Sequence, residues 1–342
     1  MIILRYHLFS SPKSKDIEYK EDEEKRRKKE KLKGAGLIAA GSIGAIGGIK
    51  ASEKLNDNFI DKAIEHFSKN NTQDKKLVDK LIKRAKEQGT KITRDKNFKN
   101  SAYLGTNGGR LLNKLDKKFK KYTGKDNYFK EGIGKELGLG KESSKEIGKD
   151  IIVMGLGDGN PAILAHEMGH AAMLRKKRSK DIIGKAAHSK VGDIMSIPTY
   201  IVFNPNKKYR RVGEAGFLGA GIVHGIKSAK REEEGDIRKS KKERRKGLIR
   251  SAVLVSPMLI REASASRKGM KYLRESGASK DTLKQSRKIL GNAFGTYASM
   301  ALKPIALEAG GTTIGYGAHK LISKSKNKKK EDNNKDKEGE NK

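Results

Sequence analysis

The 342-residue chain contains no cysteine and no tryptophan. Without cysteine it forms no disulfide and offers a metal ion no thiolate, so histidine and carboxylate side chains are the strong zinc ligands that remain. A chain without disulfides is typical of the intracellular compartment. We therefore expect an intracellular protein in which any transition-metal site is built from histidine, aspartate and glutamate.

Apolar residues are few, and acidic residues are far outnumbered by basic ones. Hydrophobic residues make up 35% of the chain and charged residues another 35%, which is a low apolar share for a compact globule throughout. Lysine and arginine number 78 against 41 acidic residues, a formal net charge of +37. This excess favours anionic partners, either nucleic acid or the anionic surface of a membrane, and does not choose between them.

The N-terminus lacks the apolar core and cleavage site of a secretory signal, so we expect no export by that route. Charged residues dominate up to residue 33, and a glycine-rich apolar segment follows at 34–49. As a helix, that segment would be about 24 Å long, slightly short of the hydrocarbon core of a bilayer. Because the flanking lysines can snorkel, the segment is just long enough to be a candidate membrane span. We expect association with a membrane from its intracellular side.

One motif carries specific chemistry, the HExxH pattern at residues 166–170. On a helix, residues four apart lie on the same face, so His166 and His170 can present both imidazoles to one metal ion. Glu167 then stands beside the metal. Its carboxylate can take a proton from a metal-bound water and return it to a leaving amine. The motif therefore predicts a metal-dependent hydrolase.

The residues around the motif predict a buried helix. Asn160 and Pro161 are typical of an N-cap and a first helical residue, and apolar residues follow on both sides of the motif. Two histidines at this spacing can also belong to an ordinary polar surface. Imidazoles and a carboxylate inside an apolar helix, however, are costly unless they are paired or bound to metal. The context therefore favours a metal site over an accidental pattern.

A catalytic zinc usually takes three protein ligands and one water, so a third ligand must lie elsewhere. Lys176 stands where a metzincin would have its third histidine, which excludes that class. Glu262 is the best candidate, because it lies among apolar residues shortly after Ser256-Pro257, which we expect to start a helix. The weaker rivals are His188, Glu214 and the run Glu232-Glu233-Glu234, the last of which should be solvated.

A short buried strand is expected at 151–156, followed by a glycine-containing turn into the HExxH helix. This order imitates a nucleotide-binding turn. Asn160 takes the place of the last glycine of GxGxxG, and the helix that follows carries the HExxH residues, so we do not expect nucleotide binding.

Three segments, in this order, resemble one known family: AILAHEMGHAAML, IREASASRKGMKYLRESG and SRKILGNAFGTYAS. They are similar to the YugP-type neutral zinc metallopeptidases, relatives of the HtpX-like membrane gluzincins. In that family the third ligand is the glutamate of an E-x-x-A-S-R-x-A segment, and here Glu262, Ala265, Ser266 and Arg267 fall on the matching positions. Ser264 and Gly269 depart from the residues common in the family, and both concern the surroundings of the site.

The resemblance spans roughly residues 150–303 and implies a zinc-dependent metalloendopeptidase acting on a peptide or protein. It implies that His166, His170 and Glu262 bind one zinc ion while Glu167 activates the water. It also implies that a strand beside the HExxH helix lines the substrate cleft. Tyr297 lies in the third matching segment, but a tyrosine among apolar residues is more often a packing residue.

Between the two ligand segments, apolar stretches at 191–203, 213–226 and 248–260 surround a charged block at 227–246. The pattern resembles a helical hairpin, and the family often carries membrane-spanning helices at this place. Glu214, His224 and Arg250 interrupt the stretches, so a buried soluble hairpin and an interfacial hairpin remain alternatives. The basic block would suit an anionic leaflet.

The expected fold is mainly α with minor β: a helical zincin-like core with a short strand before the HExxH helix. The competing hypothesis is a non-enzymatic basic protein that binds nucleic acid or a membrane and carries an accidental or degenerate HExxH. The lysine-rich ends support this alternative, whereas the lack of aromatic residues within the charge run and of a recognised nucleic-acid module speaks against it. A structural zinc would need a fourth protein ligand. The expected divisions are a charged arm at 1–33, a helical extension at 34–149, a peptidase-like domain at 150–303, an apolar segment at 304–322 and a disordered basic tail at 323–342.

Overall fold

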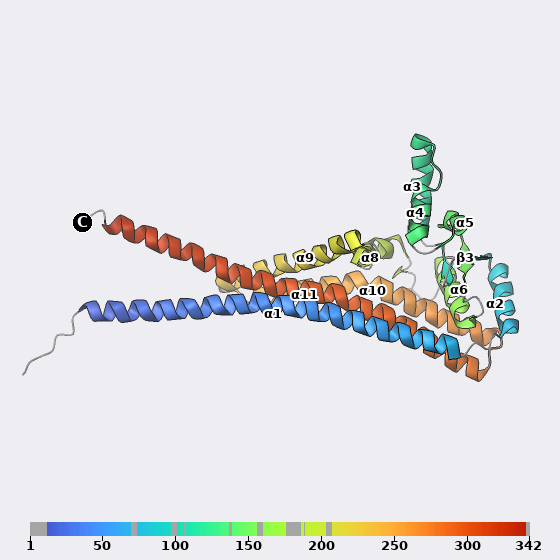
Figure 1. The fold of residues 1–342 in the computed structure, drawn as a ribbon, viewed down its shortest axis with the longest axis horizontal. Helices are drawn as coiled ribbons and strands as arrows, with labels where there is room; N and C mark the ends of the chain where they lie inside the picture. The colour runs from blue at the N-terminus through green and yellow to red at the C-terminus, as the bar shows by residue number, and fades with distance from the viewer. Residues whose placement is uncertain are drawn as a thin grey trace, which may run out of the picture. The chain divides into compact units, whose positions relative to one another are not determined.

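The computed structural model describes residues 12–69, 74–96, 101–105, 107–136, 139–155, 160–175, 186–187, 189–202 and 207–339. These residues are mainly helical with one small sheet, which confirms the predicted fold class (Figure 1). The chain divides into two compact units. The first unit comprises residues 1–46, 217–248 and 307–342, and the second comprises residues 47–216 and 249–306.

The boundaries of these two units differ from the divisions that we expected from the composition of the sequence. The boundaries expected at residues 33, 149 and 303 mark changes in charge and hydropathy, whereas both units are assembled from separate stretches of chain. The reason is that long helices contribute to both units, and a helix can change its neighbours without changing its composition.

The second unit contains a three-stranded sheet formed by β1 (Lys91–Arg94), β2 (Ser101–Tyr103) and β3 (Ile151–Met154), in the order β1-β3-β2. Strand β3 is the short strand predicted at 151–156, and all four of its residues are buried. It pairs in parallel with β1 and antiparallel with β2. A continuous apolar run is what a strand covered on both faces requires. Because β3 is the central strand, β2 lies at an edge of the sheet.

Helices α2 (Lys75–Glu87) and α6 (Pro161–Arg175) pack together in the same unit, and α6 also contacts β2 and β3. Helix α2 is amphipathic: its apolar side faces the core, and Asp74 caps its N-terminus by accepting from Leu77 N–H at 3.0 Å. The shared core includes Leu81, Met154, Leu164, Met168 and Leu273. This core fixes the helix that carries the HExxH motif.

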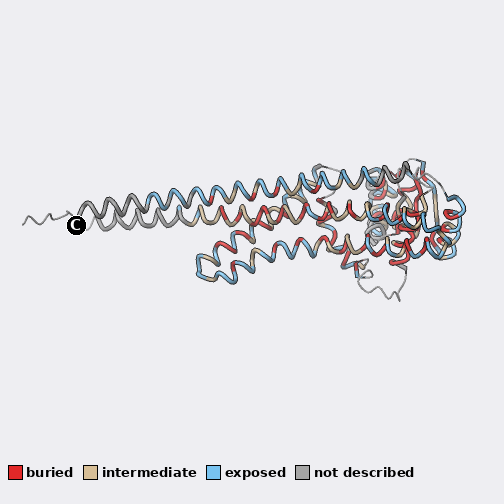
Figure 2. The backbone as a smooth tube through the Cα atoms, turned by 90° about the horizontal axis from the view of Figure 1, so that it is seen from below, coloured by how far each residue is buried: buried red, intermediate tan, exposed pale blue. Residues whose placement is uncertain are grey.

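Four smaller helices also belong to the second unit: α3 (Asn107–Thr123), α4 (Tyr128–Glu136), α5 (Lys141–Lys145) and α8 (Lys190–Val202). Helices α3 and α4 pack through the stacked rings of Phe119 and Tyr128, whose centroids are 4.9 Å apart. In Figure 2, buried residues are densest in the region where Figure 1 places the sheet and α6, while buried and exposed residues alternate along the long helices.

Four long helices build the rest: α1 (Pro12–Lys69), α9 (Lys207–Glu233), α10 (Ile237–Glu275) and α11 (Lys280–Gly339). Helices α9 and α10 form the predicted hairpin, which turns at Gly235 with φ +81°. Helix α11 continues through the segment from residue 323 that the sequence predicted to be disordered. A lysine-rich segment can be helical because lysine has good helix propensity.

The expected helix start at Ser256-Pro257 is wrong, because both residues lie inside α10. Pro257 has no N–H to donate to the carbonyl of Val253 four residues earlier. The hydroxyl of Ser256 donates to that carbonyl at 2.9 Å instead. The serine that was predicted as a cap thus satisfies the acceptor that the proline leaves open, and the helix continues to Glu275.

Within the described residues, one helical segment, Leu32–Phe59 of α1, is long and apolar enough to cross a membrane. A core helix of a soluble protein or a signal sequence would meet the same criteria. The apolar segment predicted at 34–49 lies within it.

Candidate metal centre

Helix α6 positions His166, Glu167 and His170. It begins at Pro161, and the side-chain oxygen of Asn160 accepts from the backbone N–H groups of Ala162 at 2.9 Å and Ile163 at 3.4 Å. The predicted N-cap is therefore confirmed. His166 and His170 lie one turn apart on the same face, and their rings meet edge to face with centroids 4.7 Å apart. Their Nε2 atoms are 3.1 Å apart.

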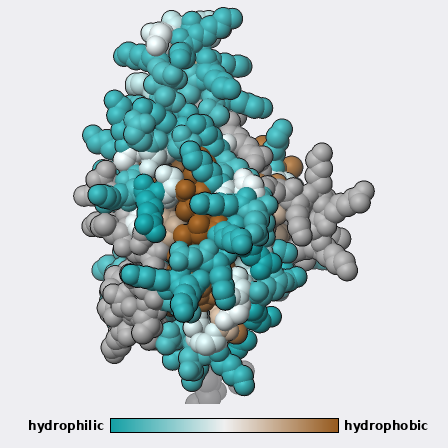
Figure 3. All heavy atoms as spheres, turned by 90° about the vertical axis from the view of Figure 1, so that its right-hand side faces the viewer, coloured by the Kyte–Doolittle hydropathy of each residue, from teal (hydrophilic) through white to brown (hydrophobic). Residues whose placement is uncertain are grey.

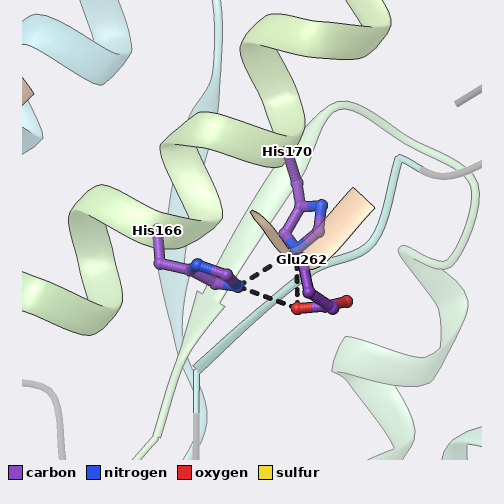
Figure 4. A group of neighbouring side chains, drawn as sticks. All are labelled: His166, His170 and Glu262. Atoms are coloured by element: carbon purple, nitrogen blue, oxygen red, sulfur yellow. Dashed lines mark hydrogen bonds and ion pairs between the residues drawn. The ribbon is translucent and has the colours of Figure 1, made fainter. Parts of the chain in front are cut away.

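Helix α10 brings Glu262 to the same point from the other side (Figure 4). Its Oε2 lies 3.2 Å from Nε2 of His166 and 3.5 Å from Nε2 of His170. His166 and Glu262 are buried, and His170 is nearly so. The sequence singled out these three residues as a ligand set. Although His166 and Glu262 are 96 positions apart in the chain, the structure brings one possible ligand atom of each of the three residues to the same point.

Close packing of α6 on α10 makes this convergence possible. A Cβ at Gly169 would collide with the backbone of Ala265, and a Cβ at Gly269 would lie 2.9 Å from the backbone of Ala165. The two helix backbones are therefore in direct contact at both places. Gly269, which departs from the family pattern, takes part in this contact as one half of a reciprocal pair.

The Ser266 hydroxyl is within hydrogen-bond distance of the His166 ring nitrogen that faces away from the other candidate ligands. Its Oγ lies 3.1 Å from Nδ1 of His166, on the side of the ring opposite to the converging Nε2 atom. Glu262 and Ser266 are four residues apart on α10, so one helical face supplies both a candidate ligand and the hydroxyl that orients its neighbour. A hydroxyl that accepts from Nδ1–H leaves the lone pair on Nε2, the tautomer that a metal ligand needs.

Glu167 points from α6 toward the sheet. Its Oε2 accepts a hydrogen bond from the backbone N–H of Tyr103 in β2 at 2.8 Å. This bond fixes the carboxylate at the end of an edge strand and beside the two histidines. Sequence reasoning missed Tyr103, since a backbone donor leaves no signature in residue type. Ser266 gave a weak signal through its helical spacing from Glu262.

The charges at the site are strongly coupled. Burial raises the pKa of the Glu167 carboxyl, and the nearby His166 and His170 lower it without restoring the ordinary value. Burial alone would lower the pKa of His170, but Glu262 outweighs it and the pKa is raised. Burial likewise raises the pKa of Glu262, yet His170 and His166 prevail and hold it well below its ordinary range. Glu262 is therefore an anion at neutral pH, as a cation ligand must be.

The rival ligands lie elsewhere or outside the described residues. Glu214 pairs with Lys303 at 2.6 Å, and Glu232 accepts from the Tyr316 hydroxyl at 2.7 Å in the first unit. His188, Lys176 and the glycine turn at 157–159 fall outside the described residues. Tyr297 packs against an apolar cluster that includes Met258 and Ala301, as expected for a packing residue.

The group His166, His170 and Glu262 could hold a metal ion. Two imidazole nitrogens and one carboxylate oxygen face one another, and such lone pairs repel unless protons or a cation lie between them. Comparison with known proteins adds no relative, since the chain matches no family profile, no curated protein and no solved structure. The geometry of the site is therefore the basis for assigning a function.

Proposed function

We propose that the protein is a zinc-dependent metalloendopeptidase that hydrolyses peptide bonds through a metal-activated water. The observation that carries this proposal is the convergence of two histidines and one glutamate beside a second glutamate held by an edge strand. Three protein ligands with one open position is the arrangement of catalytic zinc sites, whereas structural sites are closed by four.

The distances among the three donor atoms suit zinc. Zinc binds nitrogen and oxygen at about 2.0–2.2 Å in a tetrahedral site, so neighbouring ligand atoms should lie about 3.3–3.6 Å apart. The observed separations run from 3.1 to 3.5 Å. The donor set also suits zinc, which accepts imidazole and carboxylate together. Small movements of the side chains would complete the fit.

The roles of the residues follow from their positions. A zinc ion held by His166, His170 and Glu262 would supply Lewis acidity to a water and to the scissile carbonyl. Glu167 takes a proton from the water and returns it to the leaving amine. Because the Tyr103 N–H binds Oε2 of Glu167, Oε1 is the oxygen available for that proton.

Strand β2 is the better candidate for lining the substrate cleft. The family resemblance implies this role for a strand beside the HExxH helix, but β3, which precedes that helix, is paired on both sides and has no free edge. Strand β2 lies at the edge, contacts α6 and holds Glu167. An extended peptide can add to an exposed strand edge by backbone hydrogen bonds. We further propose that the enzyme works on the intracellular side of a membrane, which the apolar segment of α1 and the excess of basic residues support.

Zinc content tests the proposal directly. The full-length protein is purified, adventitious metal is removed with a weak chelator, and zinc per chain is measured by elemental analysis. We expect one zinc per wild-type chain and none in His166→Ala or Glu262→Ala. Glu142→Ala is the matched control, because its side chain is 84% exposed on α5. This control should keep its zinc.

Circular dichroism must show each variant folded for the comparison to count. A folded wild type without zinc would overturn the peptidase proposal. Steeply salt-dependent DNA binding by such a zinc-free protein would then favour a basic nucleic-acid-binding protein.

A further inference from the structure

A hollow in the second unit is lined by residues of α2, α6 and α10 and contains none of the candidate metal ligands. Its volume is about 310 Å³, at the lower end of the range for pockets that bind small molecules. Ala172 of α6 and the buried Tyr272 of α10 contribute apolar wall. Because alanine is small, a space remains here where a larger side chain would fill the gap between the helices.

The hollow and the metal centre lie on different sides of the contact between α6 and α10, whose backbones touch. Ala172 follows His170 by two residues, which places it about 200° further around the axis of α6. Lys268, which also lines the hollow, follows Glu262 by six residues and lies about 240° further around α10. The hollow is therefore separate from the site that would hold zinc.

A second hollow, with a volume of about 580 Å³, adjoins the first. The two hollows share Arg84, Gln88 and Glu275. Together they form a groove between α2 and the C-terminal part of α10, which we call the α2–α10 groove. Along α2 the groove runs from Lys80 to Gln88, about 12 Å of helix. An extended chain covers this length with three to four residues at about 3.3 Å each.

The α2–α10 groove is basic. Figure 3 shows the face on which Figure 1 places α2 and the α10–α11 turn, and this face is hydrophilic apart from a narrow apolar strip. Five basic side chains line the groove against two acidic ones, an excess of three positive charges: Lys80, Lys83, Arg84, Lys268 and Lys271 against Glu87 and Glu275. A concave surface with one sign of charge attracts ligands of the opposite sign.

The contacts of Glu275 show that the groove accommodates a carboxylate. Its side chain contacts the Arg84 guanidinium of α2 and lies 3.4 Å from Nζ of Lys271 on its own helix. Contacts between charged groups of this kind are stronger than neutral hydrogen bonds. Lys80, Lys83 and Lys271 are exposed, so the carboxylates of a ligand can reach their ammonium groups in the same way.

The residue types in the groove favour carboxylates over phosphates. Phosphate recognition commonly uses clusters of arginine, whereas Arg84 is the one arginine among the residues that line the groove. Single-stranded nucleic acid stacks its bases on aromatic faces. Tyr272 is only 5% exposed, and the Arg84 guanidinium lies over its ring at 4.8 Å. Separate lysines on the two walls, with apolar wall beside Ala172 between them, suit an extended acidic peptide that also carries an apolar side chain.

We propose that the α2–α10 groove binds an acidic peptide segment, with its carboxylates at the lysines of the two walls and an apolar side chain in the hollow beside Ala172. The partner is thus a protein or peptide with a short run of aspartate or glutamate. This inference stands on the groove alone and does not depend on zinc or on peptidase activity.

Binding to the full-length protein is measured by fluorescence anisotropy, with a fluorescein-labelled peptide in which glutamates flank a central leucine. The same peptide with glutamines reports binding of the label itself. Lys83→Gln/Lys271→Gln removes one charge from each wall of the groove. Lys117→Gln/Lys118→Gln is the matched control, because both lysines are exposed on α3 and the net charge falls equally. Ala172→Leu fills part of the hollow without changing the charge.

We expect Lys83→Gln/Lys271→Gln to weaken binding about 3–10-fold, since each exposed ion pair contributes modestly. Ala172→Leu should also weaken it several-fold, and the α3 control should bind as the wild type does. Equal losses in the two double variants would overturn the proposal, because the overall charge would then attract the peptide. So would a short single-stranded DNA of equal charge that displaces the label at lower concentration than the unlabelled peptide, because the groove would then prefer phosphates.

Acetylation of lysines in the wild-type protein locates the peptide without any substitution. The rate of acetylation at each lysine is measured by mass spectrometry with and without the glutamate peptide. We expect the peptide to slow the reaction several-fold at Lys83 and Lys271 and to leave Lys117 and Lys118 unchanged. Equal protection at all four lysines, or protection at none, would overturn the assignment to this groove.

Discussion

Gly169 of α6 lies against the backbone of Ala265 of α10, three residues beyond Glu262. The glycine of the HExxH motif therefore sets the distance between the two helices that carry the candidate ligands. With any side chain at this position the helices could not approach as closely, and Glu262 would be withdrawn from the two imidazoles. The separation of the donor atoms is in this sense a consequence of backbone packing.

Alanine at Gly169 or Gly269 should push α6 and α10 apart. Overpacking of this kind costs about 1–3 kcal/mol of folding free energy. We expect both variants to unfold at lower denaturant concentration and to bind zinc more weakly than the wild type. Gly291→Ala on α11 is the control, because its Cβ would meet nothing within 4 Å. There the exchange should stabilise the helix by about 0.5–1 kcal/mol. A change in the free energy of unfolding with the same sign at all three positions would contradict the packing argument.

Removing the hydroxyl of Ser266 should weaken the metal site without dismantling it. In Ser266→Ala, His166 loses the partner of its Nδ1 atom, and the ring is free to rotate and to change tautomer. Loss of such a partner typically costs about 10–100-fold in metal affinity. Zinc affinity is measured by competition with a chromophoric chelator. Ser266→Thr keeps a hydroxyl and should restore most of the affinity, so equal losses in both variants would argue against this role.

The local parts of the site could be predicted because their causes are local. Asn160 caps α6 through its own side chain, β3 is apolar on both faces, and a buried glutamate such as Glu262 needs a partner wherever it lies. Residue types and spacing suffice for each of these predictions.

Other features depend on tertiary contacts between distant segments, and residue types and spacing do not predict which segments come into contact. The N–H of Tyr103 is chemically like any other until folding places it beside Glu167. Pro257 is a helix breaker in isolation, yet Ser256 satisfies the carbonyl it leaves open. The two units are likewise defined by neighbours of long helices and not by composition.

Glu167→Gln should separate metal binding from turnover. Glutamine keeps the size of the side chain and can still accept from the Tyr103 N–H, but it cannot take a proton from water. We expect zinc to stay at the wild-type level while hydrolysis of an unfolded protein substrate falls about 10²–10⁴-fold or more. Glu142→Gln on α5 provides the matched surface exchange. Hydrolysis that persists in zinc-loaded Glu167→Gln would remove this residue from the mechanism.

Arg84 and Glu275 join α2 to the end of α10, and this contact should make stability depend on pH. Burial raises the pKa of Glu275, but the Arg84 guanidinium outweighs it and the pKa lies below the ordinary value of 4.5. The stabilisation is therefore complete above about pH 5 and is lost as the pH falls through the lowered pKa. Because both side chains are partly exposed, we expect only about 0.5 kcal/mol. Urea unfolding of wild type and Glu275→Gln should differ by this amount at pH 7, and the difference should shrink as the pH falls through the lowered pKa of Glu275. A difference that stays constant as the pH falls would mean that packing of the Glu275 stem, and not its charge, stabilises the contact.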